Sequence, residues 1–207
     1  MVFESLVVGP LGVNCFILGC DKTGQGIIVD AGDDARSIIA AAERLGLIIS
    51  QVISTHGHFD HVGANRVVLE HFKAHLLIHA ADAPMLGRAA DVARAYGLQG
   101  DNSPEPEQFL TDGMEISFGS CRLTVLHTPG HTPGGCCLYL ADEKTVITGD
   151  TLFADSIGRT DLPGGSHQQL LESIRTKLFT LPDDVTAYPG HGPETNIGHE
   201  KRHNPYF

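Results

Sequence analysis

Positively charged residues are scarce in this chain. Lys and Arg total 14 against 25 Asp and Glu, which gives a formal net charge of −11. Nucleic acids and anionic membranes would be repelled by such a protein, so neither is expected as a partner. Charged residues make only 19% of the chain and hydrophobic residues make 42%, which excludes a disordered protein. Nothing in the sequence indicates an obligate protein partner.

Long apolar runs and paired cysteines are also missing. No run reaches the roughly 18 residues that a membrane-spanning helix needs. The N-terminus has Glu4 where a signal peptide carries a positive charge, and its apolar stretch stops at Gly9 and Pro10. Five cysteines without a CxxC spacing argue against both a disulfide framework and a thiolate zinc site. We therefore predict a reduced, cytoplasmic protein.

The order of elements predicts an α/β fold. A length of 207 residues fits one large domain or two small ones. Apolar runs between turns predict strands over residues 3–8, 15–19, 26–30, 48–54, 75–79, 115–118, 122–127, 137–140, 145–148 and 185–188. Helical spacing predicts three helices: one between an N-cap at Asp33 or Asp34 and a stop at Gly46, one over 62–72, and one after Ser166. Residues 81–112 show a less regular pattern. The alternation suggests two sheets between helices, although periodicity alone does not fix the topology.

Histidine is the residue that the chain has in excess. The segment 55–61, THGHFDH, follows a buried strand and holds His56, His58, Asp60 and His61. These four side chains cannot share one face of a helix or strand. On a loop they can surround one or two positions in space, and Gly57 gives the backbone the conformational freedom to bend around them. Imidazole and carboxylate together suit Zn, Fe or Mn, so this cluster predicts a metal site.

Three further candidates stand where a strand gives way to a Gly- or Pro-rich loop. They are His131 in TPGHTPGG, Asp150 in TGD and His191 in YPGHGP. Each alone is more typical of an ordinary turn. Together with the first cluster they make five His and two Asp, which is too many for one tetrahedral ion and suits two ions sharing a bridging carboxylate and a hydroxide. The other histidines are expected to be surface or core residues: His71, His75, His79, His127, His167, His199 and His203.

This pattern resembles the metallo-β-lactamase superfamily, in its glyoxalase II (hydroxyacylglutathione hydrolase) branch, over nearly the whole chain. The resemblance implies a four-layer αββα sandwich, with a two-metal site on the edge between two pseudo-symmetric halves that act as one domain over 1–207. It implies two divalent ions, zinc first and iron or manganese as alternatives. The implied ligands are His56, His58 and His131 for one ion, Asp60, His61 and His191 for the other, and Asp150 as the bridge.

The segment from Asp150 to Arg159 resembles the glyoxalase II branch more specifically. Arg159 falls where that family has a basic residue contacting glutathione, whereas Asp161 stands in place of a substrate-contacting Tyr. The chain is similar to a short bacterial group without the C-terminal helical extension that completes the glutathione pocket. These two departures weaken the expectation that the thiol carrier is glutathione. They do not affect thioester hydrolysis, which remains the implied activity.

We therefore predict a metal-dependent hydrolase of acyl thioesters, with S-D-lactoylglutathione as the first candidate substrate. A hydroxide bridging the metals, oriented by Asp60 and Asp150, would attack the carbonyl. The scarcity of Lys and Arg makes coenzyme A a less favourable carrier than glutathione. The first alternative is a persulfide dioxygenase with one iron, which shares the string from Gly158 to Asp161. A small-phosphodiester hydrolase and a non-catalytic metal-binding module are the others.

Overall fold

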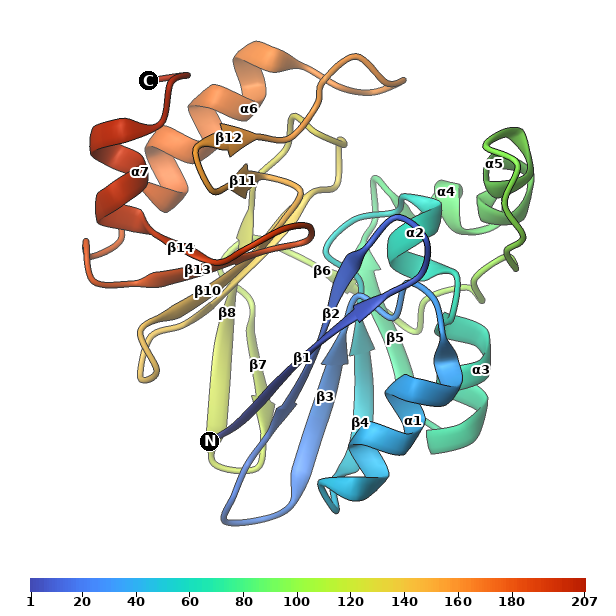
Figure 1. Cartoon of the computed structure of the whole chain (residues 1–207). Helices are drawn as coiled ribbons and strands as arrows, with labels where there is room; N and C mark the ends of the chain where they lie inside the picture. The colour runs from blue at the N-terminus through green and yellow to red at the C-terminus, as the bar shows by residue number, and fades with distance from the viewer. The chain divides into compact units, whose positions relative to one another are not determined.

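The computed structural model describes all 207 residues and divides them into two compact units (Figure 1). The first unit comprises residues 1–110 and 117–122, and the second comprises 111–116 and 123–207. The structure has two six-stranded sheets: the first lies within the first unit, and the second lies in the second unit except for residues 117–122. No helix has the length and apolar character that crossing a membrane requires.

The sheet of the first unit follows the order of the chain. Its strands are β1 (Val2–Val8), β2 (Val13–Gly19), β3 (Gln25–Val29), β4 (Ile48–Ile53), β5 (His75–His79) and β6 (Gln108–Leu110), in that spatial order. The first three are antiparallel, and β3 to β6 run parallel to one another. Parallel neighbours need long crossover connections, and the helices lie in these connections.

The helices of the first unit are α1 (Ala35–Arg44), α2 (Phe59–Val62), α3 (Asn65–Phe72), α4 (Ala83–Leu86) and α5 (Ala89–Ala95). The side chain of Asp34 caps α1 by accepting the N–H of Ser37 at 3.4 Å. Ile38 and Ala42 of α1 and Val68 of α3 are fully buried in one apolar cluster with residues of β2, β3, β4 and β5. Burial of these helix faces holds the strand ends in place.

The second unit has a mixed sheet as well. Its strands are β7 (Glu115–Phe118), β8 (Cys121–His127), β9 (Cys136–Leu140), β10 (Thr145–Gly149), β13 (Thr186–Pro189) and β14 (Thr195–Asn196), in that spatial order. Strand β9 is antiparallel to both of its neighbours, β8 and β10, and β10 runs parallel to β13. A small hairpin, β11 (Leu152–Phe153) and β12 (Ser156–Ile157), follows β10.

Two helical segments complete the second unit. Helix α6 (His167–Ser173) continues into a π-helical turn over Ile174–Leu178, and α7 (Ile197–His203) lies near the C-terminus. Ser166 caps α6, as its spacing to Gln169 predicts, by accepting the N–H of Gln169 at 3.4 Å. Leu170 of α6 is fully buried in a cluster with residues of β9, β10 and β13.

The α/β fold-class prediction is confirmed, and the helix predicted over 62–72 is found for the most part as α3. The helix predicted over 62–72 is interrupted, because α2 ends at Val62 and α3 begins at Asn65. At Gly63 the chain passes so close to another loop that a Cβ would lie 2.6 Å from the carbonyl oxygen of Gly32. The less regular stretch 81–112 contains α4, α5 and β6.

The cysteines form no disulfide. Cys121 is half-buried, and the other four are buried: Cys15, Cys20, Cys136 and Cys137. Cys136 and Cys137 begin β9, as expected for small core residues at a strand start.

Candidate metal centre

The four candidate ligands of the first unit come together directly after strand β4. His56 and His58 lie on the connecting loop, and Asp60 and His61 lie on the single turn of α2. The ring centroid of His56 is 4.8 Å from that of His58 and 4.1 Å from that of His61. The Nε2 atom of His61 is 3.9 Å from Oδ2 of Asp60. The sequence predicts a loop for the whole segment 55–61. In the structure its second half belongs to α2, which brings Asp60 and His61 close to His56.

A buried carboxylate that the sequence analysis missed orients His61. Asp30, fully buried after β3 with a left-handed φ of 54°, has its Oδ2 3.0 Å from Nδ1 of His61. The same side chain accepts the N–H of Thr55 at 2.7 Å and the hydroxyl of Thr55 at 2.8 Å. A carboxylate accepts the Nδ1 proton, so the Nε2 lone pair of His61 is left to face a metal ion.

Thr55 extends this network to His56. Its Oγ1 atom donates to Asp30 and lies 3.1 Å from Nδ1 of His56, so it accepts the Nδ1 proton. His56 therefore also presents Nε2 for metal binding. The next residue, Gly57, donates its N–H to the buried Asp82 at 3.0 Å, and a Cβ there would lie 2.9 Å from the Asp82 carbonyl oxygen. Only glycine fits this turn between the two histidines.

The three candidate ligands of the second unit also converge. His131, Asp150 and His191 follow strands β8, β10 and β13, as the sequence predicts. Oδ2 of Asp150 is 3.5 Å from Nε2 of His131 and 3.7 Å from Nε2 of His191. Two ligand atoms about 2.1 Å from one tetrahedral ion are about 3.4 Å apart, so this spacing fits metal ligation. One Asp150 oxygen within reach of both imidazoles also suits a bridging carboxylate.

The backbone of Arg159 orients His131. The carbonyl oxygen of Arg159 lies 2.8 Å from Nδ1 of His131 and accepts its proton, which leaves Nε2 for a metal ion. The donor set in each unit is therefore chemically suited to divalent cations: neutral imidazoles with defined tautomers, and carboxylates beside them.

Gly158 fixes the position of Asp150 by close backbone packing. A Cβ at Gly158 would lie 1.8 Å from the carbonyl oxygen of Asp150 and 3.3 Å from Cβ of His131. We expect Gly158→Ala to displace both ligands, to lower the metal content and to destabilise the fold by about 1–3 kcal/mol. Elemental analysis and urea unfolding measure the two effects. Gly87→Ala is the control, because no atom lies within 4 Å of its Cβ position, and normal metal content in Gly158→Ala would contradict the expectation.

The two candidate substrate contacts are paired with each other. Nε of Arg159 donates to Oδ1 of Asp161 and Nη2 to Oδ2, both at 2.8 Å. These hydrogen bonds lower the pKa of Asp161 to about 2. Both side chains are more than half exposed, so the pair is accessible from solvent. Asp161 thereby offsets the charge that Arg159 would offer to an anionic substrate.

A third group of possible ligands lies on α7 and the β11–β12 turn. Glu200 is fully buried, and its carboxylate accepts the N–H of Asp155 and the side-chain donors of Thr195 and Asn204. His199 lies 2.7 Å from Oδ1 of Asp155. These bonds tie the turn after β11 to α7, which gives the group a structural explanation without a metal.

Comparison with known proteins identifies relatives over the whole chain. The family model described as "Metallo-beta-lactamase superfamily" matches residues 8–191. The "Hydroxyacylglutathione hydrolase GloC" of Haemophilus influenzae is 36% identical over 209 aligned positions, covering 100% of this chain and 98% of that protein.

Solved structures agree with this assignment. The BLEG-1 B3 metallo-beta-lactamase is similar with a TM-score of 0.92 and 36% identity, over 99% of each chain. TTHA1623 in a di-iron-bound form has a TM-score of 0.91 and 36% identity, over 99% of this chain and 100% of that one. ETHE1 from Myxococcus xanthus has a TM-score of 0.83 and 30% identity, over 99% of this chain and 84% of that one.

Proposed function

Because the chain belongs to the metallo-β-lactamase superfamily of metallo-hydrolases, we propose that it hydrolyses acyl thioesters with two divalent metal ions. The observation that carries the proposal is the Asp150 carboxylate, with one oxygen 3.5 Å from His131 and 3.7 Å from His191. The ligands that we propose are His56, His58 and His131 for one ion and Asp60, His61 and His191 for the other, and Asp150 would be shared by both.

The two ions would supply Lewis acidity, which lowers the pKa of a bound water to near neutrality and polarises a substrate carbonyl. The chain's own residues do the positioning. Asp30, Thr55 and the Arg159 carbonyl hold the imidazoles with Nε2 turned outward. Asp60 and Asp150 would accept hydrogen bonds from the attacking water and thereby orient its lone pair toward the carbonyl carbon. A thiolate is a good leaving group, so no general acid is required.

The substrate we propose first is a hydroxyacylglutathione, with S-D-lactoylglutathione as its simplest member. A relative bearing the name hydroxyacylglutathione hydrolase and covering the whole chain supports this choice. We propose that Arg159 contacts the glutathione carboxylates. Its ion pair with Asp161 partly neutralises its positive charge. Zinc is the first candidate metal, and iron is supported by the di-iron form of TTHA1623. The location that we propose is the cytoplasm.

The proposal is tested by steady-state hydrolysis of S-D-lactoylglutathione by protein of measured metal content. We expect turnover of this substrate, loss of turnover after chelation, and recovery when zinc or iron is restored. A thioester of a different thiol, assayed in parallel, tests the carrier. Faster turnover of the glutathione thioester supports the proposed substrate, whereas equal turnover of both indicates a general thioesterase.

A persulfide dioxygenase is the second candidate, and the likeness to ETHE1 together with the string from Gly158 to Asp161 favours it. The residues around the last histidine, Gly190-His191-Gly192, favour the hydrolase, because persulfide dioxygenases resemble this chain but carry Ala and an acidic residue there. Absence of hydrolysis, with about one iron per chain and oxygen uptake on glutathione persulfide, would replace the first proposal by this one.

A further inference from the structure

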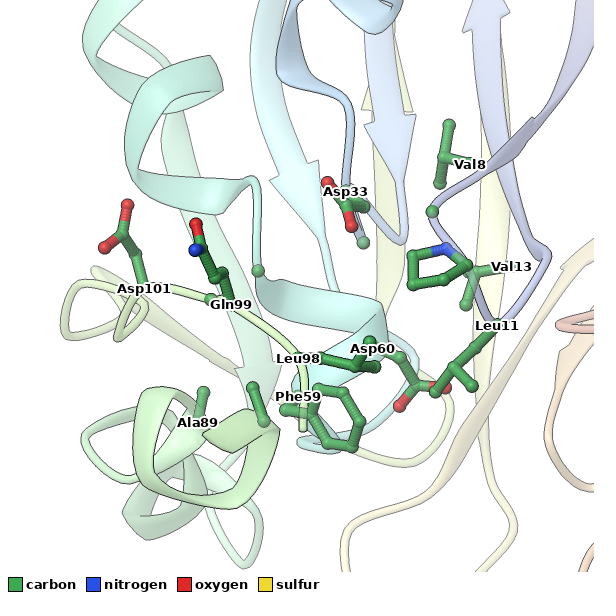
Figure 2. A pocket seen from close by; sticks show the side chains of 16 residues that line it. Val8, Leu11, Val13, Asp33, Phe59, Asp60, Ala89, Leu98, Gln99 and Asp101 are labelled. Carbon is green, nitrogen blue, oxygen red and sulfur yellow. The ribbon is translucent and has the colours of Figure 1, made fainter. Parts of the chain in front are cut away.

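A small cavity of about 50 Å³ lies in the first unit beside Asp60 (Figure 2). Five segments form its walls: the β1–β2 turn, residues 32–33 after β3, the α2 region, α5 and the stretch 98–101. Its larger side chains are Val8, Leu11, Val13, Phe59, Leu98 and Gln99. The side chain of Asp60 forms part of the same wall, with Leu11 and Phe59 near it in the view. The cavity therefore adjoins a proposed metal ligand.

All ionisable side chains that line the cavity are acidic. Its ionisable residues are Asp33, Asp60 and Asp101, and no Lys or Arg contributes to it. A carboxylate entering this cavity would meet acidic residues without a cation to pair with, which is unfavourable. Glutathione carries two carboxylates at neutral pH, so its peptide is a poor fit. An uncharged, mostly apolar group is a good fit for walls of Val, Leu and Phe.

The volume limits the occupant to a few atoms. One water-sized probe position requires roughly 10–15 Å³ on the same measure, so about 50 Å³ holds about three to five non-hydrogen atoms. An acyl group of two to four carbons has this size. An eight-carbon chain is too long unless the wall is opened.

The walls are fixed by contacts of their own. Gly9 and Gly12 both have φ of 67°, and the Gly12 N–H donates to the Gly9 carbonyl at 3.2 Å, which shapes the turn that carries Leu11. On the opposite side, the ring of Phe59 lies 5.4 Å from that of Tyr96, which follows α5. The N–H of Leu98 donates to Ala93 of α5 at 2.9 Å. The cavity is thus largely preformed, as specific small-molecule sites are.

We propose that this cavity binds the acyl group of the substrate and restricts the protein to thioesters of short acyl chains. The inference rests on the proposed thioester hydrolysis: Asp60 would hold a metal ion, and the cavity adjoining Asp60 is the neighbouring space that an acyl group of the substrate could occupy. The thiol carrier stays outside it. Leu11 and Leu98 are the residues that set the chain length: Leu11 is 43% exposed and Leu98 is half-buried, so either can be shortened without opening the core.

The kinetic test compares S-acetyl-, S-butyryl- and S-octanoylglutathione as substrates of the zinc-loaded protein. We expect kcat/KM for the octanoyl substrate to be at least about tenfold below that for the butyryl substrate. Leu98→Ala and Leu11→Ala each raise the octanoyl-to-butyryl ratio about tenfold. Val92→Ala is the matched control: Val92 lies on α5, is 41% exposed and does not line the cavity, so the ratio stays unchanged. An unchanged ratio in both leucine variants overturns the inference.

A binding measurement separates this inference from the proposed function. S-Butylglutathione has no ester bond to cleave, and its addition to zinc-loaded protein is followed by the methyl NMR signals of Leu11, Val13 and Leu98. We expect these signals to shift with S-butylglutathione and to shift less with S-octylglutathione, while the Val92 methyls do not move. Shifts without hydrolysis of any thioester would refute the activity and retain the cavity's role. Hydrolysis without these shifts would refute the cavity's role alone, and failure of both would refute both.

Discussion

Replacing Asp150 by alanine is expected to remove bound metal and hydrolytic activity together. The carboxylate supplies one oxygen that lies 3.5 Å from Nε2 of His131 and 3.7 Å from Nε2 of His191. Loss of an outer-shell partner costs about 10–100-fold in metal affinity or activity, so loss of a bridging ligand should cost more than about a hundredfold. Elemental analysis of the purified variant and its rate on S-D-lactoylglutathione provide the two measurements.

The matched control for this variant is Asp184→Ala. Asp184 is in the same unit, its carboxylate is 59% exposed, and it pairs with Lys144 at 2.5 Å, away from the candidate ligands. We expect normal metal content and rate in the control, because exposed ion pairs contribute little. Full activity at normal metal content in Asp150→Ala would eliminate the two-metal scheme. Reduced metal content with an unaltered rate per bound ion would leave Asp150 as a structural ligand only.

Changing Asp30 to asparagine is expected to weaken metal binding without removing a ligand. The amide group cannot accept all three hydrogen bonds that the carboxylate accepts from Thr55 and His61. An amide N–H turned to His61 would favour the tautomer with the proton on Nε2, which cannot bind a metal ion. We expect a loss of about 10–100-fold in metal affinity and about 1–3 kcal/mol in the free energy of unfolding.

Competition with a chromophoric chelator measures the affinity of the Asp30→Asn protein, and urea unfolding of the metal-free protein measures its stability. Asp21→Asn is the control in the same unit, since Asp21 is 61% exposed and pairs only weakly, at 3.5 Å, with the N-terminal ammonium. An affinity equal to that of the wild type, in a variant that is measurably less stable, would show that Asp30 supports the fold and does not tune His61.

The candidate ligands were predictable because their positions follow from local pattern. A buried strand before His56, and turns after strands at His131 and Asp150, place such side chains at strand ends. Asp30 was not recognised, since an acidic residue between an apolar run and a glycine also fits an ordinary turn. Its signal is positional: Asp30 is an ionisable residue immediately after a strand whose last four residues are buried.

The interrupted helix at Gly63 escaped prediction for a different reason. The apolar spacing over 62–72 continues across the break, so periodicity cannot reveal it. At this break Gly63 lies against Gly32, a contact between residues far apart in sequence. The cavity beside Asp60 has the same origin, because its walls come from five separate segments. Residue spacing in a single sequence can indicate which side chains carry the chemistry. It cannot predict the contacts between distant segments that shape the space around those side chains.

The strand order of the first sheet has a consequence for how the protein is made. Each of its strands lies beside its neighbour in sequence, so the sheet is complete once the chain reaches Leu110. At a synthesis rate of about 5–20 residues per second, several seconds pass before the rest of the chain follows. Asp30 and the His56–His61 segment can therefore take up their arrangement on the nascent chain before Asp150 has been added. The order of translation would then make folding of the first cluster of candidate ligands precede completion of the proposed metal site.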